Sequence, residues 1–205
     1  MDDELTDKLR IREQVQNWVI WRDSGDWEKF RTVWHEGAQM QATWFRGPVE
    51  NFIAHASKNF GRGTIDAQLL HFLGGTSIEL KGTRAIAQTK KRIESRQTVE
   101  GVTCDVVCLG RFYQFFEKRD GRWAIVLHQG IYEKDRLDPV DPARVPVLDR
   151  DLLASFPEGY RHLAYVQTKA GFAVKRDMPG FRGRELERLY AAGATFLANG
   201  PAAYI

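Results

Sequence analysis

Two residues with acid–base chemistry, a histidine and an aspartate, stand out in this sequence. His71 lies in an apolar, strand-forming run from Gln68 to Thr76, where an unpaired imidazole is costly to bury. Asp23 lies upstream in the segment Trp21–Trp27, at the predicted end of the first helix. A carboxylate that orients an imidazole makes a pair able to abstract a proton. The alternative is a structural histidine that bonds a backbone carbonyl.

Other polar side chains fall on predicted strands, where alternation decides which of them share a face. In the last long strand, His128, Gly130 and Tyr132 lie on one face. The opposite face is predicted to carry Trp123, Ile125, Leu127 and Gln129. In a second strand, one face carries Thr89, Lys91, Ile93 and Ser95. The sequence leaves open which face of that second strand is the inner one.

Each of these side chains has a chemical and a structural interpretation. His128 is a second acid or base, or a histidine satisfied within the sheet. Tyr132 donates a hydrogen bond to a substrate oxygen, or is an aromatic residue at a rim. Lys91 on an inner face stabilises a phenolate or enolate, while Arg22 binds an oxyanion or pairs with Asp23. Trp18, Trp44 and Phe112 either provide flat apolar walls for an aromatic ligand or pack in an ordinary core.

Helical patterns come first in the chain and strand patterns second. Helices are predicted at 5–22, 26–34 and 47–59, with a short strand at 39–45 and a helix stop at Phe60–Gly63. Four long runs rich in β-branched and aromatic residues follow, with glycine turns between them, at 67–80, 84–98, 102–117 and 122–132. They predict an antiparallel meander that curls, since sheets twist. The predicted fold class is α+β, with helices covering a concave sheet that forms a pocket.

The C-terminal third of the chain differs in character. Proline-rich residues 138–146 mark an irregular connector, and two more helices are predicted at 159–175 and 184–197. We expect one domain over 1–137 and a helical extension over 138–205, which packs on the same domain or on a neighbouring subunit. The extension is rich enough in aromatic residues to close a pocket mouth, with Tyr160, Tyr165, Phe172 and Phe181.

Composition limits the partners and the location of the protein. The net charge is +3, and the basic residues are dispersed among acidic ones, which argues against nucleic acid as a partner. Cys104 and Cys108 lie about 13 Å apart along one predicted strand, too far for a disulfide, so we expect free thiols.

No stretch predicts a membrane span or a signal peptide. We expect a soluble, cytoplasmic homo-oligomer, a trimer or dimer, that uses no metal and no cofactor. Surface or structural positions are expected for His35, His55 and His162.

Two motifs in this order resemble the SnoaL-like branch of the NTF2-like superfamily. The first is Trp-Arg-Asp-Ser-Gly-Asp-Trp at a helix end, and the second is His-Phe-Leu-Gly-Gly-Thr at the opening of a sheet. The resemblance spans roughly residues 5–135 and implies a cystatin-like cone with the His128 face lining its pocket. In this branch, which includes scytalone dehydratase and a hexachlorocyclohexane dehydrochlorinase, the positions of Asp23 and His71 form the catalytic dyad. Scytalone dehydratase has tyrosines where this chain has Arg22 and Ala42–Trp44, so the resemblance does not extend to that activity.

The residues and the resemblance together predict a cofactor-independent lyase. It eliminates water, or another small fragment such as formaldehyde, from a small aromatic or polycyclic substrate, with His71 as base and Asp23 as its orienting carboxylate. The expected substrate-binding residues are Trp18, Arg22, Trp44, Lys91, Phe112, His128 and Tyr132. One alternative is an isomerase of the ketosteroid isomerase type or a polyketide cyclase. Another is a non-catalytic NTF2-like module that binds a ligand or assembles with partners.

Overall fold

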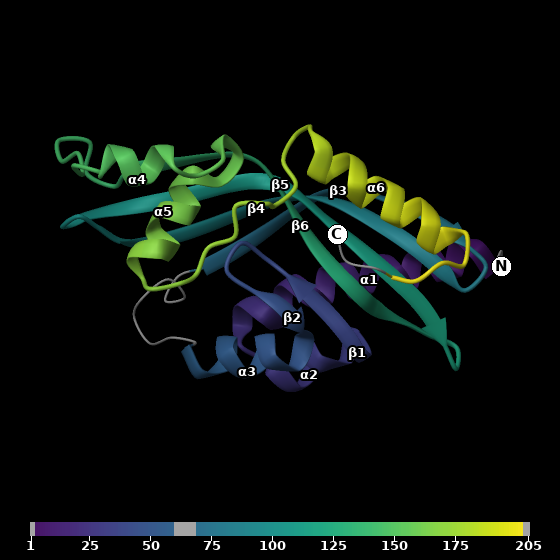
Figure 1. Ribbon diagram of the computed structural model, residues 1–205. Helices are drawn as coiled ribbons and strands as arrows, with labels where there is room; N and C mark the ends of the chain where they lie inside the picture. The colour runs from purple at the N-terminus through teal and green to yellow at the C-terminus, as the bar shows by residue number, and fades with distance from the viewer. Residues whose placement is uncertain (1–2, 60–68, 203–205) are drawn as a thin grey trace.

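A curled six-stranded sheet with helices packed on both faces forms the protein (Figure 1). The computed structural model describes residues 3–59 and 69–202. The strands are β1 (Trp34–Gln41), β2 (Arg46–Pro48), β3 (Leu69–Lys81), β4 (Arg84–Val99), β5 (Val102–Arg119) and β6 (Arg122–Pro139). Their order in the sheet is β2-β1-β6-β5-β4-β3. The predicted α+β class and the antiparallel meander of β3 to β6 are confirmed.

Tight turns set the register of the long strands. In the β4–β5 turn, Glu100 and Gly101 have φ angles of 45° and 78°. In the β5–β6 turn, Asp120 and Gly121 have φ angles of 50° and 78°. Two successive positive φ values are the signature of the hairpin turns whose twist matches that of the flanking strands. Pairing extends over almost the whole length of β5, without a register shift toward β4 and with two register shifts toward β6.

Three N-terminal helices cover one face of the sheet, namely α1 (Asp3–Ser24), α2 (Trp27–Thr32) and α3 (Val49–Asn59). Asp26 caps α2 by accepting a hydrogen bond from the backbone N–H of Lys29 at 3.2 Å. The helix ends earlier than predicted because Trp34 starts β1 and pairs in parallel with Ile125 of β6. The strand expected at 39–45 accordingly begins sooner and ends at Gln41. The helix stop expected at Phe60–Gly63 lies outside the described residues.

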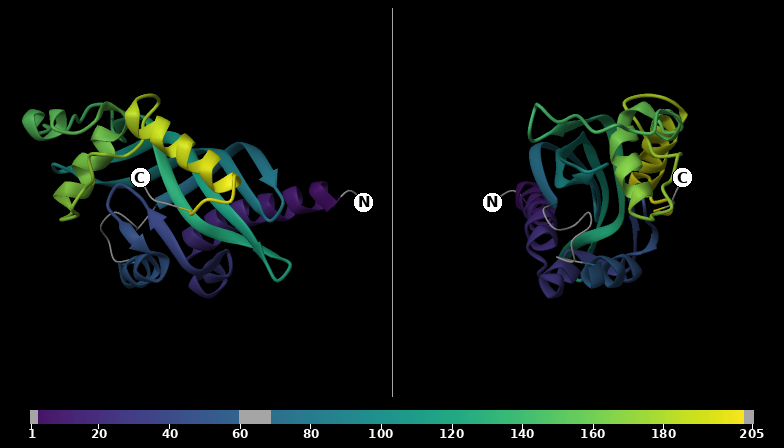
Figure 2. Two further views of the ribbon diagram at one scale, coloured as in Figure 1. Left: turned by 45° about the vertical axis from the view of Figure 1, so that its right-hand side comes forward. Right: turned by 90° about the vertical axis from the view of Figure 1, so that its left-hand side faces the viewer.

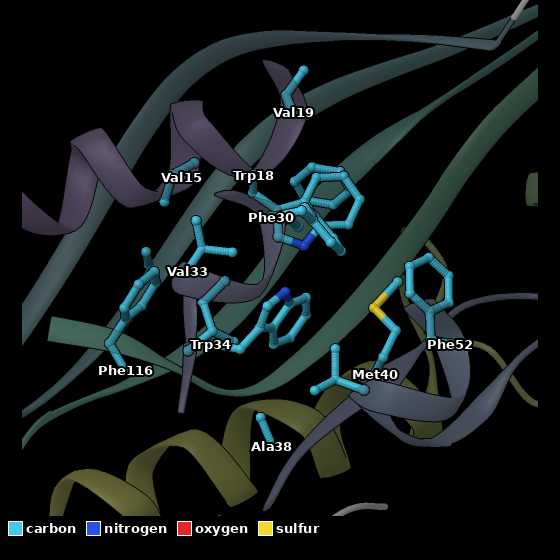
Figure 3. Packing of buried hydrophobic residues seen from close by; sticks show 14 of the residues in the cluster. Val15, Trp18, Val19, Phe30, Val33, Trp34, Ala38, Met40, Phe52 and Phe116 are labelled. Atoms are coloured by element: carbon cyan, nitrogen blue, oxygen red, sulfur yellow. The ribbon is translucent and has the colours of Figure 1, made fainter. Parts of the chain in front are cut away.

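Aromatic residues fill the space between these helices and the sheet. Figure 3 shows Trp18 of α1 against Phe30 of α2, with ring centroids 5.5 Å apart in an edge-to-face arrangement. Trp18 also lies 4.9 Å from the ring of Phe112 on β5, so α1 is fastened directly to the sheet. This packing places the end of α1, where Asp23 lies, over the sheet.

A bulge in β6 changes which of its residues face the helices. The β5–β6 pairing passes from Phe115–Leu127 to Phe116–Ile125, which leaves Val126 as an extra residue. Trp123 and Ile125 therefore pack in the same core as Trp18, on the face that also carries His128. Strict alternation had placed those two residues on the opposite face, and that prediction was wrong for them because the bulge resets the alternation.

The C-terminal residues cover the rest of the sheet on both of its faces. The elements are α4 (Arg150–Ala154), the 3-10 turn η1 (Glu158–Tyr160), α5 (Arg161–Lys169) and α6 (Arg184–Leu197). η1 and α5 pack on Cys104, Val106 and Cys108, which alternate in step with Phe112 on the α1 face of β5. α6 lies over the sheet on the side away from α1 (Figure 2), where it packs on Tyr113 and Phe115. Both cysteines are free and buried.

Two expectations for this region need correction. The helix expected at 159–175 ends at Lys169, because Gly171 takes a φ of 89° and the chain leaves the helix. Of the aromatic residues expected at a pocket mouth, Tyr160 and Tyr165 are buried in the core and Phe181 is 71% exposed. Of these four residues, Phe172 is the one that lines the same cavity as His71.

Candidate active site

A cavity of about 60 Å³ lies between the sheet and helices α1, α3 and α5. Of the residues predicted for the site, those that line it are Trp18, Arg22, Trp44, His71, Phe112, His128 and Tyr132. Its walls are mostly aromatic and apolar, with a few polar groups, which is the usual make-up of a small-molecule site. The cavity volume suffices for a few water molecules or a compact organic group.

Asp23 holds His71 by two hydrogen bonds. One carboxylate oxygen lies 2.7 Å from Nδ1 of the imidazole, and the other accepts the backbone N–H of the same residue at 2.6 Å. The side chains are only 6% and 12% exposed for His71 and Asp23. A carboxylate only accepts, so Nδ1 carries the ring proton and Nε2 keeps its lone pair. The geometry therefore leaves one basic nitrogen on a residue that lines the cavity.

Burial keeps the imidazole of His71 neutral. Desolvation lowers its pKa below the ordinary value of 6.5, and the hydrogen bond and charge of Asp23 oppose this shift. The nearby positive charges of Arg22 and Lys91 lower the pKa further. His71 is therefore present as a free base near neutral pH.

His128 lies beside His71 in a tighter setting. Its ring stacks on Trp18, with centroids 4.9 Å apart and planes 9° from parallel, and its Nδ1 is 3.2 Å from Nε2 of Gln114. Burial holds the pKa of His128 well below 6.5. When Gln114 donates to Nδ1, the proton of the neutral ring sits on Nε2. His128 then acts as a hydrogen-bond donor at this site.

Tyr132 and Thr43 form the polar side of the cavity. The backbone N–H of Thr43 donates to the Tyr132 hydroxyl at 3.3 Å, and Thr43 Oγ1 donates to Oε1 of Gln167 at 2.7 Å. Burial raises the pKa of Tyr132, so the phenol stays protonated. Since the hydroxyl oxygen already accepts from Thr43, its own proton is available to a ligand in the cavity.

Lys91 is buried next to the cavity without being one of its lining residues. Its Nζ lies 3.9 Å from the centroid of the Tyr132 ring and 5.5 Å from that of Phe112. The side chain belongs to the inner face of β4, together with Ile93, which does line the cavity. Lys91 was predicted to bind substrate, and the structure places its amine over the face of the Tyr132 ring.

Several lining residues were missed from the sequence. Thr43 carries no motif, and Leu163 and Gln167 come from α5, beyond the part of the chain that carried the resemblance. His55, expected at the surface, is exposed and also lines the cavity, with its ring 5.1 Å from Trp44 and 5.7 Å from Phe172. A helical pattern with no polar signature does not predict that α5 borders a site.

A second aspartate–histidine pair occurs outside the cavity. Asp135 accepts the backbone N–H of His162 at 2.6 Å and lies 2.9 Å from its Nδ1, and it also accepts the N–H of Leu163. These are the first free N–H groups of α5, so Asp135 serves as a helix cap. His162 does not line the cavity. The pairing alone is thus not diagnostic of chemistry, and the cavity distinguishes Asp23–His71.

Within the described ranges, no group of three or more His, Cys, Asp or Glu side chains is placed to hold a metal ion. None of the described helices is long and apolar enough to cross a membrane.

Comparison with known proteins gives a family match and two kinds of relatives. Residues 3–127 match the SnoaL-like domain family. The pea pathogenicity protein 2 of Fusarium vanettenii is 39% identical over 180 residues, which cover 86% of this chain and 76% of the relative. An uncharacterized protein of Emericella nidulans is 36% identical over 190 residues, covering 88% and 79%.

Solved structures of the NTF2-like, cystatin-like fold also superpose on the chain. A type 2 hexachlorocyclohexane dehydrochlorinase (LinA) has a TM-score of 0.56 at 14% identity, covering 72% of this chain and 97% of its own. A scytalone dehydratase candidate from Novosphingobium aromaticivorans has a TM-score of 0.54 at 16% identity, covering 73% and 97%. At these identities the likeness establishes the fold, and the fold is one that includes lyases.

Proposed function

Because this chain belongs to the SnoaL-like domain family and has an aspartate-bound histidine at a cavity, we propose that it is a lyase. In this proposal, His71 removes a proton from a substrate carbon while a leaving group departs from the neighbouring carbon. The observation that carries the proposal is that Asp23 accepts two hydrogen bonds from His71, which fixes the tautomer and leaves Nε2 as the base. The reaction combines proton transfer between side chains and substrate with cleavage of the bond to the leaving group.

The walls of the cavity indicate the class of substrate. Trp18, Trp44 and Phe112 present flat aromatic surfaces, which favour a planar or cyclic ligand. A volume of about 60 Å³ favours a single ring over a fused polycycle, since a larger ligand must displace side chains. The proposed substrate is therefore a small aromatic or alicyclic compound with a leaving group next to an acidic C–H bond. Water is the leaving group we favour, and release of formaldehyde uses the same kind of base.

Other polar groups on the cavity wall support departure of an oxygen. Arg22 is 3% exposed and brings a permanent positive charge to the cavity wall. Tyr132 and His128 are neutral hydrogen-bond donors on β6. Preorganised donors of this kind stabilise charge that develops on a leaving oxygen.

A substrate screen tests the proposal directly. Purified protein is incubated with a panel of cyclic alcohols, aromatic diols, chlorinated rings and β,γ-unsaturated ketones, and products are followed by mass spectrometry. A lyase gives a product lighter by the leaving group, and an isomerase gives one of unchanged mass. The His71→Ala variant is the control, and turnover that survives this substitution contradicts the assigned base. If His71→Ala binds a panel member as the parent protein does and neither turns it over, a binding module is the better description.

The pH dependence follows from the neutral base. The pKa of His71 is lowered below 6.5 by burial, so the free base is the major form at pH 6.5 and above, and its fraction falls as the pH drops through that lowered pKa. We expect kcat/KM for the identified substrate to fall as the pH is lowered, with the midpoint of this fall below pH 6.5. The measurement is a kcat/KM profile from about pH 4 to about pH 8. An acid limb centred above pH 6.5 contradicts the buried, neutral histidine.

A further inference from the structure

Lys91 is the most anomalous buried group in the described part of the chain. It is 4% exposed, and its Nζ has no hydrogen-bond partner. Lysine is almost never fully buried without a partner, because desolvating an ammonium group is costly. Burial accordingly lowers the pKa of Lys91 to about 8, which leaves the amine mostly charged at neutral pH. Because burying this ammonium group costs free energy of folding, we looked to function for the reason that Lys91 occupies this position.

The sheet register explains how the side chain reaches its position. Lys91 of β4 pairs with Gly110 of β5, which in turn pairs with Tyr132 of β6. The strand between them thus has no side chain at the crossing point. A Cβ at position 110 would lie 2.0 Å from the carbonyl oxygen of Ile131, so only glycine fits there. Lys91 extends over this gap and places Nζ on the face of the Tyr132 ring, 3.9 Å from its centroid.

Neighbouring charges do not neutralise Lys91. Cys108 of β5 lies nearby, but burial raises the pKa of its thiol to about 12 and keeps it uncharged. Glu133 of β6 attracts the ammonium only at a distance, and its carboxylate is bound to Arg111 at 2.6 Å. The histidines that face Lys91, His71 of β3 and His128 of β6, are neutral. The Tyr132 ring, with its centroid 3.9 Å from Nζ, is nearer to this charge than the Phe112 ring at 5.5 Å.

Both ends of Tyr132 are arranged to stabilise negative charge on its oxygen. The ammonium of Lys91 lies under the ring, and the backbone N–H of Thr43 donates to the hydroxyl at 3.3 Å. Thr43 is itself held by the C-terminal residues, since its carbonyl accepts the N–H of Lys175 at 2.7 Å and its hydroxyl binds Gln167. We propose that Lys91 is a positioning residue that acts through Tyr132 and makes its hydroxyl the proton donor to the leaving group. This inference rests on the lyase function proposed above.

The step balances as an elimination of water. Nε2 of His71 takes the proton from carbon, and the electron pair of that C–H bond becomes the new C=C bond. The C–O bond to the leaving hydroxyl breaks, and that oxygen takes the phenolic proton of Tyr132 and leaves as water. An imidazolium and a phenolate remain, and a proton passes from the first to the second before the next turnover. Lys91 touches no reacting atom and lowers the energy of the phenolate.

A substrate-free measurement tests the coupling. Tyr132 is replaced by a fluorinated tyrosine whose phenol in the folded protein titrates below pH 8, where Lys91 still carries its charge, and the ¹⁹F NMR shift is followed against pH. We expect Lys91→Met to raise the pKa of this phenol by about one unit, a tenfold change in acidity, because the cation under the ring is lost. Lys90→Met is the matched control, since Lys90 is an exposed neighbour on the other face. An unchanged or lowered pKa in Lys91→Met overturns the proposal.

Kinetics on a substrate found by the screen provide the second readout. Lys91→Met should lower kcat about 10- to 100-fold with little change in KM, and Lys91→Arg, which keeps the charge, should restore part of kcat. Met removes an unpaired buried charge, so the variant should be at least as stable as the parent. A purely structural lysine predicts lost stability and an unchanged kcat, which overturns the proposal. If His71→Ala keeps full turnover, the lyase mechanism fails, while the NMR coupling stands or falls separately.

Discussion

Asparagine in place of Asp23 is expected to lower kcat by roughly 10⁴-fold with the fold intact, as for a catalytic histidine held in the wrong tautomer. Oδ2 of Asp23 accepts the backbone N–H of His71, and Oδ1 accepts from Nδ1. Asparagine has one oxygen, which takes the backbone N–H, so its NH₂ group meets Nδ1. Nδ1 must then accept, and the ring proton moves to Nε2, where the base is lost. His71→Ala should cost about 10²- to 10⁴-fold, and the double variant little more than the worse single one.

The chain contains its own matched control for this experiment. Asp135 holds His162 through the same two kinds of hydrogen bond, but His162 does not line the cavity. Asp135→Asn should therefore lower the thermal unfolding midpoint through the weakened α5 cap and leave kcat within about twofold. Steady-state kinetics give kcat, and circular dichroism melts give the unfolding midpoint, for both Asp23→Asn and Asp135→Asn. An equal loss of kcat in both variants would mean that Asp23 acts through folding and not through the histidine.

Truncation after Pro146 is expected to prevent stable folding. It removes the partners of two apolar surfaces of the sheet, among them Phe156, Tyr160 and Leu163 on one face and Leu189 and Phe196 on the other. Each such side chain contributes about 1.5–3 kcal/mol when buried. The sum over both surfaces exceeds the roughly 5–15 kcal/mol by which a whole domain is stable. The measurements are soluble yield, circular dichroism and urea denaturation.

A shorter truncation separates the two surfaces. Ending the chain after Arg182 removes α6 and the residues that follow it, which cover Tyr113 and Phe115 on the face away from the cavity. This variant should lose several kcal/mol of unfolding free energy, by the same area argument. It should also keep the cavity wall formed by Leu163, Gln167 and Phe172. Native stability and kinetics in the variant that ends at Pro146 would show that the extension is dispensable.

Local patterns in the sequence were sufficient for most of the elements. Turn residues such as Glu100-Gly101 and Asp120-Gly121 adopt the positive φ values that two-residue hairpin turns require, so the long hairpins could be predicted. The helix at 184–197 begins and ends where its periodicity does. The bulge at Val126 has no local signal, because it arises from how β6 must bend to pair with both β5 and β1. Its effect on Trp123 and Ile125 was therefore missed.

The residues of the candidate site also fall into those that local sequence predicts and those that it does not. Asp23 and His71 were found from residue types, order and resemblance. His128 and Tyr132 followed from alternation along a strand, and the aromatic wall residues Trp18, Trp44 and Phe112 from the resemblance. Gln167 and Leu163 could not be found in this way, because an amphipathic helix does not reveal which surface it covers. The relation of Lys91 to Tyr132 depends on a register of three strands across Gly110, which local sequence does not encode.

The sequence by itself determined the chemistry that is available: a carboxylate at a helix end, a histidine in a strand, and a curled antiparallel sheet to hold them. Those features follow from side-chain type, periodicity and turn geometry, which act over a few residues. Only the tertiary structure decided that both oxygens of Asp23 accept hydrogen bonds from His71. It also decided that Asp135, in the second aspartate–histidine pair, caps a helix, and that the amine of Lys91 lies on the face of the Tyr132 ring. These are contacts between segments far apart in the chain, and they depend on strand register and packing, which are properties of the whole fold.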